Sequence, residues 1–137
     1  MLYTAQDRRR IAAWAVVFAG AMLLPGCGGP SAPPEAEGKS VAEPFLTAIR
    51  EDRLDAAWDS TTAEFKSDMG RETFHRFAKS HPVLHEPLTY VGYQADQTNG
   101  IERGACDYQS VAPPSAKIRI LVARENKVWK VERLIVE

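Results

Sequence analysis

The spacing of apolar side chains changes once along this chain, at Pro87, and that change limits what the chain can fold into. Between residues 41 and 81 the apolar positions recur every three or four residues, as on helices that bury one face. From residue 88 onward they alternate with polar positions, as on half-buried strands. A helical half followed by a strand half predicts the α+β class, with N-terminal helices packed on a mostly antiparallel four-stranded sheet.

Three helices are expected in the first half. The first begins at Val41, the second covers about residues 54–65 with a break before its end, and the third runs from Arg71 until Pro82 removes the backbone donor that would continue it. The apolar faces of these helices are expected to carry Phe45, Leu46, Ile49, Leu54, Ala57, Trp58, Phe65, Phe74 and Phe77.

Four strands are expected in the second half, at residues 88–95, 101–111, 116–122 and 128–136. Asn99-Gly100 separates the first two strands and is a strong signal for a two-residue hairpin turn. A domain of about 100 residues with this layout buries somewhat over roughly 60% of its unfolded surface and folds without disulfides.

The first residues have the order of an export signal. Three arginines at positions 8–10 precede an uninterrupted apolar run over 11–24, and Pro25-Gly26-Cys27 follows. As a helix at 1.5 Å per residue the run is about 21 Å long, which is short of the roughly 20 residues that span a bilayer core. The sequence therefore favours a signal peptide over 1–26 that is removed, rather than a retained transmembrane helix.

The end of this segment, Leu24-Pro25-Gly26-Cys27, resembles the lipobox of bacterial lipoproteins. The resemblance implies cleavage between Gly26 and Cys27 and lipidation of Cys27 by a diacylglycerol and an N-acyl chain such as palmitate. It also implies a protein anchored in the cell envelope and facing the periplasm or the exterior, with Gly28 favouring the outer membrane in a Gram-negative host. The alternative is an ordinary secreted protein, in which Cys27 pairs with Cys106, since these are the only two cysteines.

Residues 27–40 separate this anchor from the folded part, which is expected over 41–137. The segment is rich in proline and glycine and has no large apolar side chain, so it is expected to be a flexible spacer. The whole chain has 17 Lys and Arg against 18 Asp and Glu, and removal of the signal takes away three arginines and one aspartate. A mature chain with this acidic balance is not a basic nucleic-acid binder.

Three segments of the folded part resemble the small members of the nuclear-transport-factor-2-like (cystatin-like) superfamily: residues 42–58, 71–77 and 127–131. Some of these relatives are bacterial lipoproteins that carry such a domain of unknown function. The resemblance implies a sheet that wraps a long helix into a cone with an apolar mouth. Residues expected to line a ligand pocket there are Trp58, Phe74, Phe77, Tyr90, Asp107 and Trp129; aromatic residues at these spacings also form plain hydrophobic cores.

Asp107 is an unusual residue for the middle of a strand, and two explanations are open. As in some relatives with such a pocket, it acts as a general base beside a tyrosine such as Tyr90, Tyr93 or Tyr108. The simpler explanation is a salt bridge to Arg103 or Arg119, or exposure at an edge. Cys106, if Cys27 is acylated, is expected to be a small buried apolar residue rather than a nucleophile.

No cofactor or metal site is expected. His81 and His85 have the four-residue spacing of metal ligands on a helix, but Pro82 disrupts that geometry, and His75 adds no suitable partner. The three histidines are therefore interpreted as solvated side chains in a loop. The basic residues of the late strands are interpreted as a solvated sheet face, with anionic lipid heads or glycans as the alternative partner: Lys117, Arg119, Lys127, Lys130 and Arg133.

Taken together, the sequence favours a lipid-anchored envelope protein whose domain is a binding or interaction module and not an enzyme. Its expected partners are the membrane, through Cys27, and an unknown envelope protein or a small apolar ligand. Two alternatives remain. One is an isomerase-like cone enzyme with Asp107 as the base. The other is an accessory subunit of an envelope complex, or a homodimer, that associates through its sheet.

Overall fold

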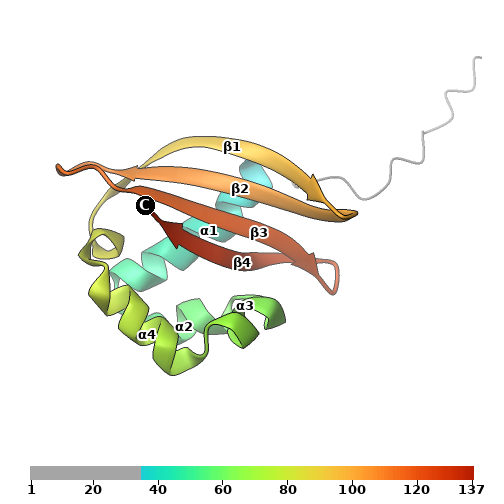
Figure 1. Cartoon of the computed structure of the whole chain (residues 1–137), viewed down its shortest axis with the longest axis horizontal. Coiled ribbons are helices and arrows are strands. Elements are labelled where there is room, and N and C mark those ends of the chain that lie inside the picture. Colours follow the sequence, from blue (N-terminus) through green and yellow to red (C-terminus); the bar gives the residue numbers. More distant parts are fainter. Residues whose placement is uncertain (1–34) are drawn as a thin grey trace, which may run out of the picture.

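A computed structural model describes residues 35–137, so the predicted signal peptide, Gly26, Cys27 and residues 28–34 lie outside the described residues. The described part belongs to the α+β class, as predicted (Figure 1). The helices come first and the strands follow. Their bounds are α1 Glu35–Arg50, α2 Leu54–Asp59, α3 Ala63–Asp68, α4 Arg71–Ser80, the 3₁₀-helix η1 Pro82–His85, β1 Leu88–Thr98, β2 Ile101–Ser110, β3 Lys117–Glu125 and β4 Val128–Val136.

The four strands form one sheet in the order β1-β2-β3-β4, and each strand is antiparallel to its neighbour. Asn99 and Gly100 join β1 to β2 with φ angles of 56° and 74°, which are the positive values that a type I′ hairpin turn needs. The hairpin predicted at these residues is therefore confirmed. Asn126 and Lys127 join β3 to β4 with φ angles of 50° and 68° in the same way.

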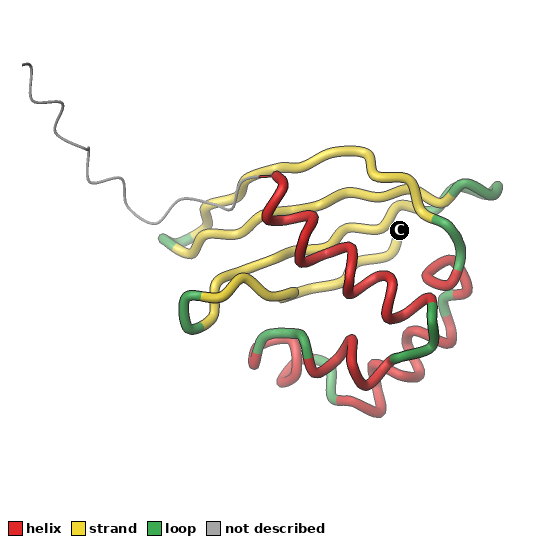
Figure 2. The backbone as a smooth tube through the Cα atoms, turned by 180° about the vertical axis from the view of Figure 1, so that it is seen from behind, coloured by secondary structure: helices red, strands yellow, loops and turns green. Residues whose placement is uncertain are grey.

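The helix α1 lies across one face of the sheet (Figure 2). The core fills the space between them, where Phe45 and Ile49 of α1 meet buried strand residues such as Ile120. The rings of Phe45, Phe65 and Phe74 pack against one another with centroids 5.7–6.2 Å apart, and these contacts join α3 and α4 to α1. No helix among residues 35–137 has the length and apolar character needed to cross a bilayer.

The second predicted helix is in fact two helices, α2 and α3, so four helices replace the three expected. The chain leaves the helical path at Thr61 and Thr62 to meet the edge of β4, where the Thr62 amide donates to the Val131 carbonyl over 2.9 Å. The Thr62 hydroxyl then caps α3 by accepting a hydrogen bond from the Phe65 amide over 3.1 Å.

The first helix begins at Glu35 and not at Val41, so residues 35–40 of the predicted spacer are helical. Gly38 is buried, and a β-carbon on it would lie 3.1 Å from the Tyr93 ring and 3.2 Å from the Cys106 sulfur. The sequence pattern missed this turn because its contact with the sheet is made by a residue without a side chain. Glutamates in the first turn also favour this helix start electrostatically.

The tight contact at Gly38 predicts the effect of adding a side chain there. Gly38→Val forces α1 away from β1 and β2 and lowers the free energy of unfolding by about 1–3 kcal/mol. Ala36→Val, at an exposed position of the same helix, costs only the difference in helix propensity, less than about 1 kcal/mol. Urea denaturation followed by circular dichroism compares the two variants, and equal losses would contradict the close packing of α1 on the sheet.

Candidate functional site

The six residues predicted to line one pocket are not brought together. Phe74 is fully buried in the aromatic core between α1, α3 and α4. The Trp58 indole donates to the Met69 carbonyl over 2.9 Å, and Phe77 packs against a histidine ring at the end of α4. Trp129 lines a separate groove of about 410 Å³ between α1, α2 and the start of β4. These four aromatic residues therefore pack between helices and strands in different places, rather than around one cavity.

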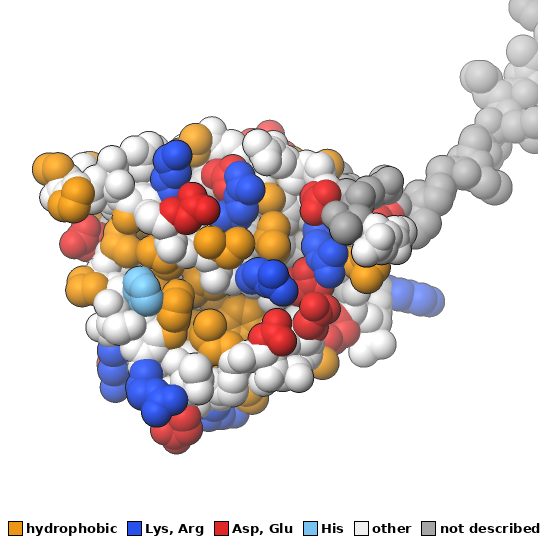
Figure 3. All heavy atoms as spheres, viewed as in Figure 1, with side chains coloured by type: hydrophobic (Ala, Val, Ile, Leu, Met, Phe, Trp, Pro, Cys, Tyr) orange, Lys and Arg blue, Asp and Glu red, His pale blue; other side chains and the backbone are white. Residues whose placement is uncertain are grey.

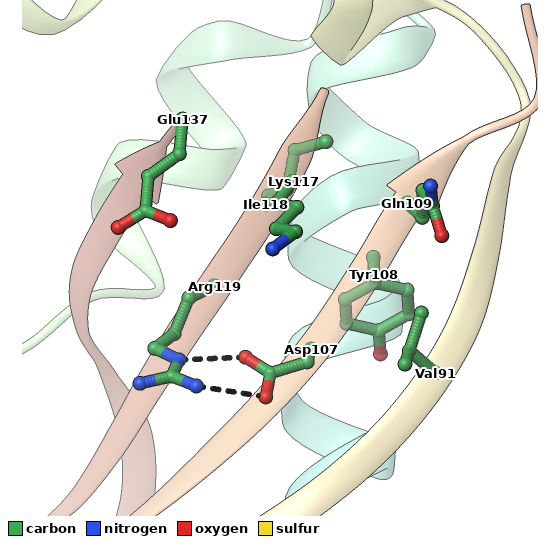
Figure 4. A pocket seen from close by; sticks show the side chains of 8 residues that line it. All are labelled: Val91, Asp107, Tyr108, Gln109, Lys117, Ile118, Arg119 and Glu137. Carbon is green, nitrogen blue, oxygen red and sulfur yellow. Dashed lines mark hydrogen bonds and ion pairs between the residues drawn. The ribbon is translucent and has the colours of Figure 1, made fainter. Parts of the chain in front are cut away.

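Asp107 lies on the outer face of the sheet, the face turned away from α1, which also carries Arg119 and Gln109 (Figure 4). Arg119 forms a bidentate salt bridge with this carboxylate, in which Nε donates to Oδ1 over 2.6 Å and Nη2 donates to Oδ2 over 2.9 Å. The predicted salt bridge to Arg119 is therefore confirmed, whereas Arg103 pairs with Glu132. The shallow hollow around Asp107 has a volume of about 270 Å³.

The outer face has no broad patch of one charge. Figure 3 views this face and shows acidic and basic side chains next to one another, with hydrophobic side chains between them. On this face Arg119 is paired with Asp107, and two further basic residues of the late strands are paired on the side of the helices, where Lys130 lines a groove with α1 and α2 and Arg133 meets α3. Pairs of this kind leave little net field for an anionic partner. These pairs are Arg119–Asp107, Lys130–Glu125 and Arg133–Asp68.

A different pocket, which we call the α1–β1 pocket, lies on the inner side of the sheet and has a volume of about 230 Å³. Four of its lining residues lie at positions i, i+3, i+4 and i+7 of α1, so they share one face of that helix. Others come from η1, from the start of β1 and from β2. The lining residues are Glu43, Leu46, Thr47, Arg50, Leu84, Glu86, Leu88, Tyr90 and Tyr108.

Tyr108 is the unusual residue of the α1–β1 pocket. Its side chain is only 4% exposed, and its hydroxyl has no hydrogen-bonding partner among residues 35–137. Tyr90, whose ring packs edge-on against it at 5.5 Å, does have a partner, because its hydroxyl donates to Glu35 over 2.6 Å. A buried hydroxyl left without a partner costs about 1–3 kcal/mol, and native structures contain few such groups.

The Tyr108 hydroxyl keeps its proton. Burial raises the pKa of Tyr108 far above its usual range, and the nearby Cys106 and Glu43 raise it further because a phenolate would lie close to their negative charges. What Tyr108 can offer to a ligand is therefore a neutral O–H donor, next to the apolar side chains of Leu46, Leu84 and Leu88 in the same lining.

Sequence reasoning named Tyr90 as a pocket residue and Tyr108 only as a tyrosine of the right type beside Asp107. The structure separates these two neighbours, because successive strand residues point to opposite faces of a sheet. The Asp107 side chain faces outward and that of Tyr108 inward, although Tyr108 also borders the hollow around Asp107. The burial pattern of β2 shows which residues face inward, because its even-numbered residues from Glu102 to Ser110 are all buried.

The three histidines do not converge on a metal site. His75 lies beside an aspartate of α2, while His81 Nδ1 is 2.8 Å from the Phe77 carbonyl oxygen and His85 Nε2 is 3.2 Å from that of Ala78. The prediction of solvated side chains was wrong for His81 and His85, since both bind carbonyls at the end of α4. No cluster of three potential metal ligands occurs in the described part of the chain.

Comparisons with known proteins support the fold alone. No family model matches the chain, and no curated protein matches it in sequence. A structure from Catenulispora acidiphila at 2.5 Å is 16% identical with a TM-score of 0.53, and the match covers 74% of this chain and 88% of that one. The 1.8 Å structure of Aln2 from a Streptomyces species is 10% identical with a TM-score of 0.53, over 77% of this chain and 93% of that one. Similarity at this level of identity does not transfer a function.

Cys106 is buried beneath Gly38, as expected of a structural cysteine, and this burial predicts its chemistry. Burial, helped by nearby carboxylates such as Asp107, raises the pKa of its thiol from 9.0 to about 11. The folded protein therefore holds the thiol proton more tightly than the unfolded chain does. We expect a free energy of unfolding that is undiminished by this group below pH 9 and falls as the pH rises toward about 11.

Urea unfolding across this pH range measures the effect, and Cys106→Ala should remove the part of the decline that begins near pH 9. At pH 8 a thiol reagent should modify the Cys106 peptide, identified by mass spectrometry, only once urea unfolds the protein. Rapid modification of the folded protein would contradict the burial of this thiol.

Proposed function

We propose that this chain is a lipid-anchored protein of the bacterial cell envelope whose domain binds a small, mainly apolar molecule in the α1–β1 pocket. The anchor is proposed on the resemblance of Leu24-Pro25-Gly26-Cys27 to a lipobox. The binding function is carried by one observation: Tyr108 lines this pocket, and its buried hydroxyl lacks a hydrogen-bonding partner among residues 35–137. A bound molecule that accepts a hydrogen bond removes the cost of that hydroxyl.

We also propose that the domain is a nuclear-transport-factor-2-like cone. The sheet curves (Figure 1), α1 lies across one of its faces (Figure 2), and the α1–β1 pocket opens between that helix and the first two strands. This arrangement supports the proposal because the cone is a curved sheet wrapped around a long helix, with its apolar mouth between the two. Small-molecule sites in general favour such concave places.

Catalysis by Asp107 is not part of the proposal. Arg119 engages both oxygens of its carboxylate, and its side chain points to the face of the sheet opposite to that of Tyr108. A general base must reach its substrate in the same site as the group that stabilises the developing charge. Binding alone is therefore the function that the geometry supports best.

The start of α1 brings the domain closer to its proposed anchor than a spacer ending at residue 40 would. Residues 28–34 reach at most about 25 Å when fully extended, at up to ~3.6 Å per residue. The helix α1 of an anchored protein would thus begin within about 25 Å of the bilayer surface.

The anchor predicts that Cys27→Ser releases the protein from membranes into the soluble fraction of the envelope, because the acyl chains attach through this sulfur. Cell fractionation with detection of the protein measures this. Cys106→Ala is the matched control and should leave the protein membrane-bound. Retention of the Cys27 variant in membranes would instead mean that the apolar run over 11–24 is kept as the anchor.

The binding function predicts that filling the α1–β1 pocket abolishes binding. We expect Thr47→Trp, at the edge of the pocket, to weaken the binding of a single-ring hydrocarbon such as methylenecyclohexane by about tenfold or more, or ~1.4 kcal/mol. Chemical shifts of ¹³C-labelled leucine methyl groups report binding, because Leu46, Leu84 and Leu88 line the pocket. The full chain in lipid nanodiscs is used.

Ala36→Trp is the control for this experiment, since residue 36 is exposed on the same helix and does not line the pocket. It should bind the hydrocarbon like the wild type. An unchanged urea midpoint for Thr47→Trp separates a filled pocket from a damaged fold. If the wild type gives no shift at these leucines with any single-ring compound, the binding function is refuted.

A further inference from the structure

The polar groups around the α1–β1 pocket differ in whether they already have a partner in the protein. This difference limits which chemical groups of a ligand they can bind. The Tyr90 hydroxyl is used by Glu35, the Glu43 carboxylate lies 3.6 Å from the Lys39 ammonium, and the Arg50 guanidinium lies 3.5 Å from the Thr47 hydroxyl. In the described part of the chain the Tyr108 hydroxyl has no such neighbour. It is therefore the buried polar group of the pocket that is available to a ligand.

The surfaces beside Tyr108 are apolar. Leu46 and Leu84 are 7% and 1% exposed and form the inner wall, and the half-buried Leu88 and the Tyr90 ring extend it outward. A molecule that reaches the Tyr108 hydroxyl must therefore place an apolar body against these side chains, where burial of apolar surface is favourable.

The charged residues and the volume of the pocket further limit the class of ligand that it can bind. The charged residues of the pocket, Glu43, Arg50 and Glu86, carry both signs and lie at its more exposed edge. The charges that act on the Tyr108 hydroxyl include that of Glu43 and not that of Arg50, the cationic residue of the lining, so an anionic group at this point would be repelled. A volume of about 230 Å³ is smaller than the range of about 300–1,000 Å³ typical of drug-sized ligands.

We infer that the α1–β1 pocket is specific for small uncharged carbonyl compounds of about one ring, whose oxygen accepts a hydrogen bond from the Tyr108 hydroxyl. The inference rests on the proposed binding function and adds the class of ligand and the residue that selects it. Tyr108 is a specificity-determining residue in this account, because a phenylalanine in its place would fill the same space without offering a donor.

A pair of ligands with the same ring tests this specificity. Cyclohexanone and methylenecyclohexane differ only in the group on the ring, an accepting oxygen in one and a CH₂ in the other. Their dissociation constants are measured for wild type and Tyr108→Phe in the full chain in nanodiscs, by the leucine methyl shifts. The hydration of each free ligand is the same with both proteins, so the change in the affinity ratio between wild type and Tyr108→Phe isolates the hydrogen bond.

We expect the preference for cyclohexanone over methylenecyclohexane to fall about three- to tenfold in Tyr108→Phe, the range of one neutral hydrogen bond. Tyr93→Phe is the matched control: it removes the hydroxyl of a tyrosine of β1 that does not line the pocket, and should leave the preference unchanged. Tyr108→Phe should also unfold at the same urea concentration as the wild type or a higher one, since the hydroxyl it removes has no partner in residues 35–137.

The outcomes separate the two proposals. If both ligands shift the leucines but Tyr108→Phe leaves their preference unchanged, the carbonyl specificity is wrong and the binding function stands. If neither ligand shifts them in the wild type, the binding function fails as well. Should Tyr108→Phe not fold, the ¹³Cζ signal of Tyr108 in the wild type decides, because only the ketone should move it when a hydrogen bond forms.

Discussion

The close approach of α1 to β1 and β2 is the contact on which the rest of this domain depends. Gly38 allows it, because any side chain there would meet the Tyr93 ring and the Cys106 sulfur. Because α1 lies close to the sheet, Phe45 contacts Phe65 of α3 and Phe74 of α4. The same approach brings the face of α1 that carries Leu46 and Thr47 against β1, and so forms the α1–β1 pocket.

The sequence pattern predicted the parts of the fold that side chains encode directly. Alternation after Pro87 predicted the four strands, and Asn99-Gly100 predicted a turn whose positive φ angles suit these two residues. The start of α1 was missed because Gly38 makes its contact by lacking a side chain. The break at Thr61 and Thr62 was missed because it depends on a hydrogen bond to Val131, which is distant in sequence.

The candidate site was harder to predict than the fold, for a physical reason. Helical and strand spacing tells which side of an element is buried, but not which buried side chains share one space. Trp58, Phe74 and Trp129 all lie on apolar faces, yet they pack in three different places. A cavity forms where packing between elements is incomplete, and that depends on the shapes of all its neighbours at once.

Asp107 and Tyr108 illustrate what decides a site in such a domain. The carboxylate looked like the reactive group in the sequence, because charge is rare in the middle of a strand, but the guanidinium of Arg119 satisfies it on the outer face. The tyrosine looked ordinary, because aromatic residues are common in strands. Its hydroxyl is nevertheless buried at the inner face with no partner in residues 35–137. An unmet hydrogen bond costs more than a met ion pair contributes, so the unsatisfied group is the one that a ligand stabilises most.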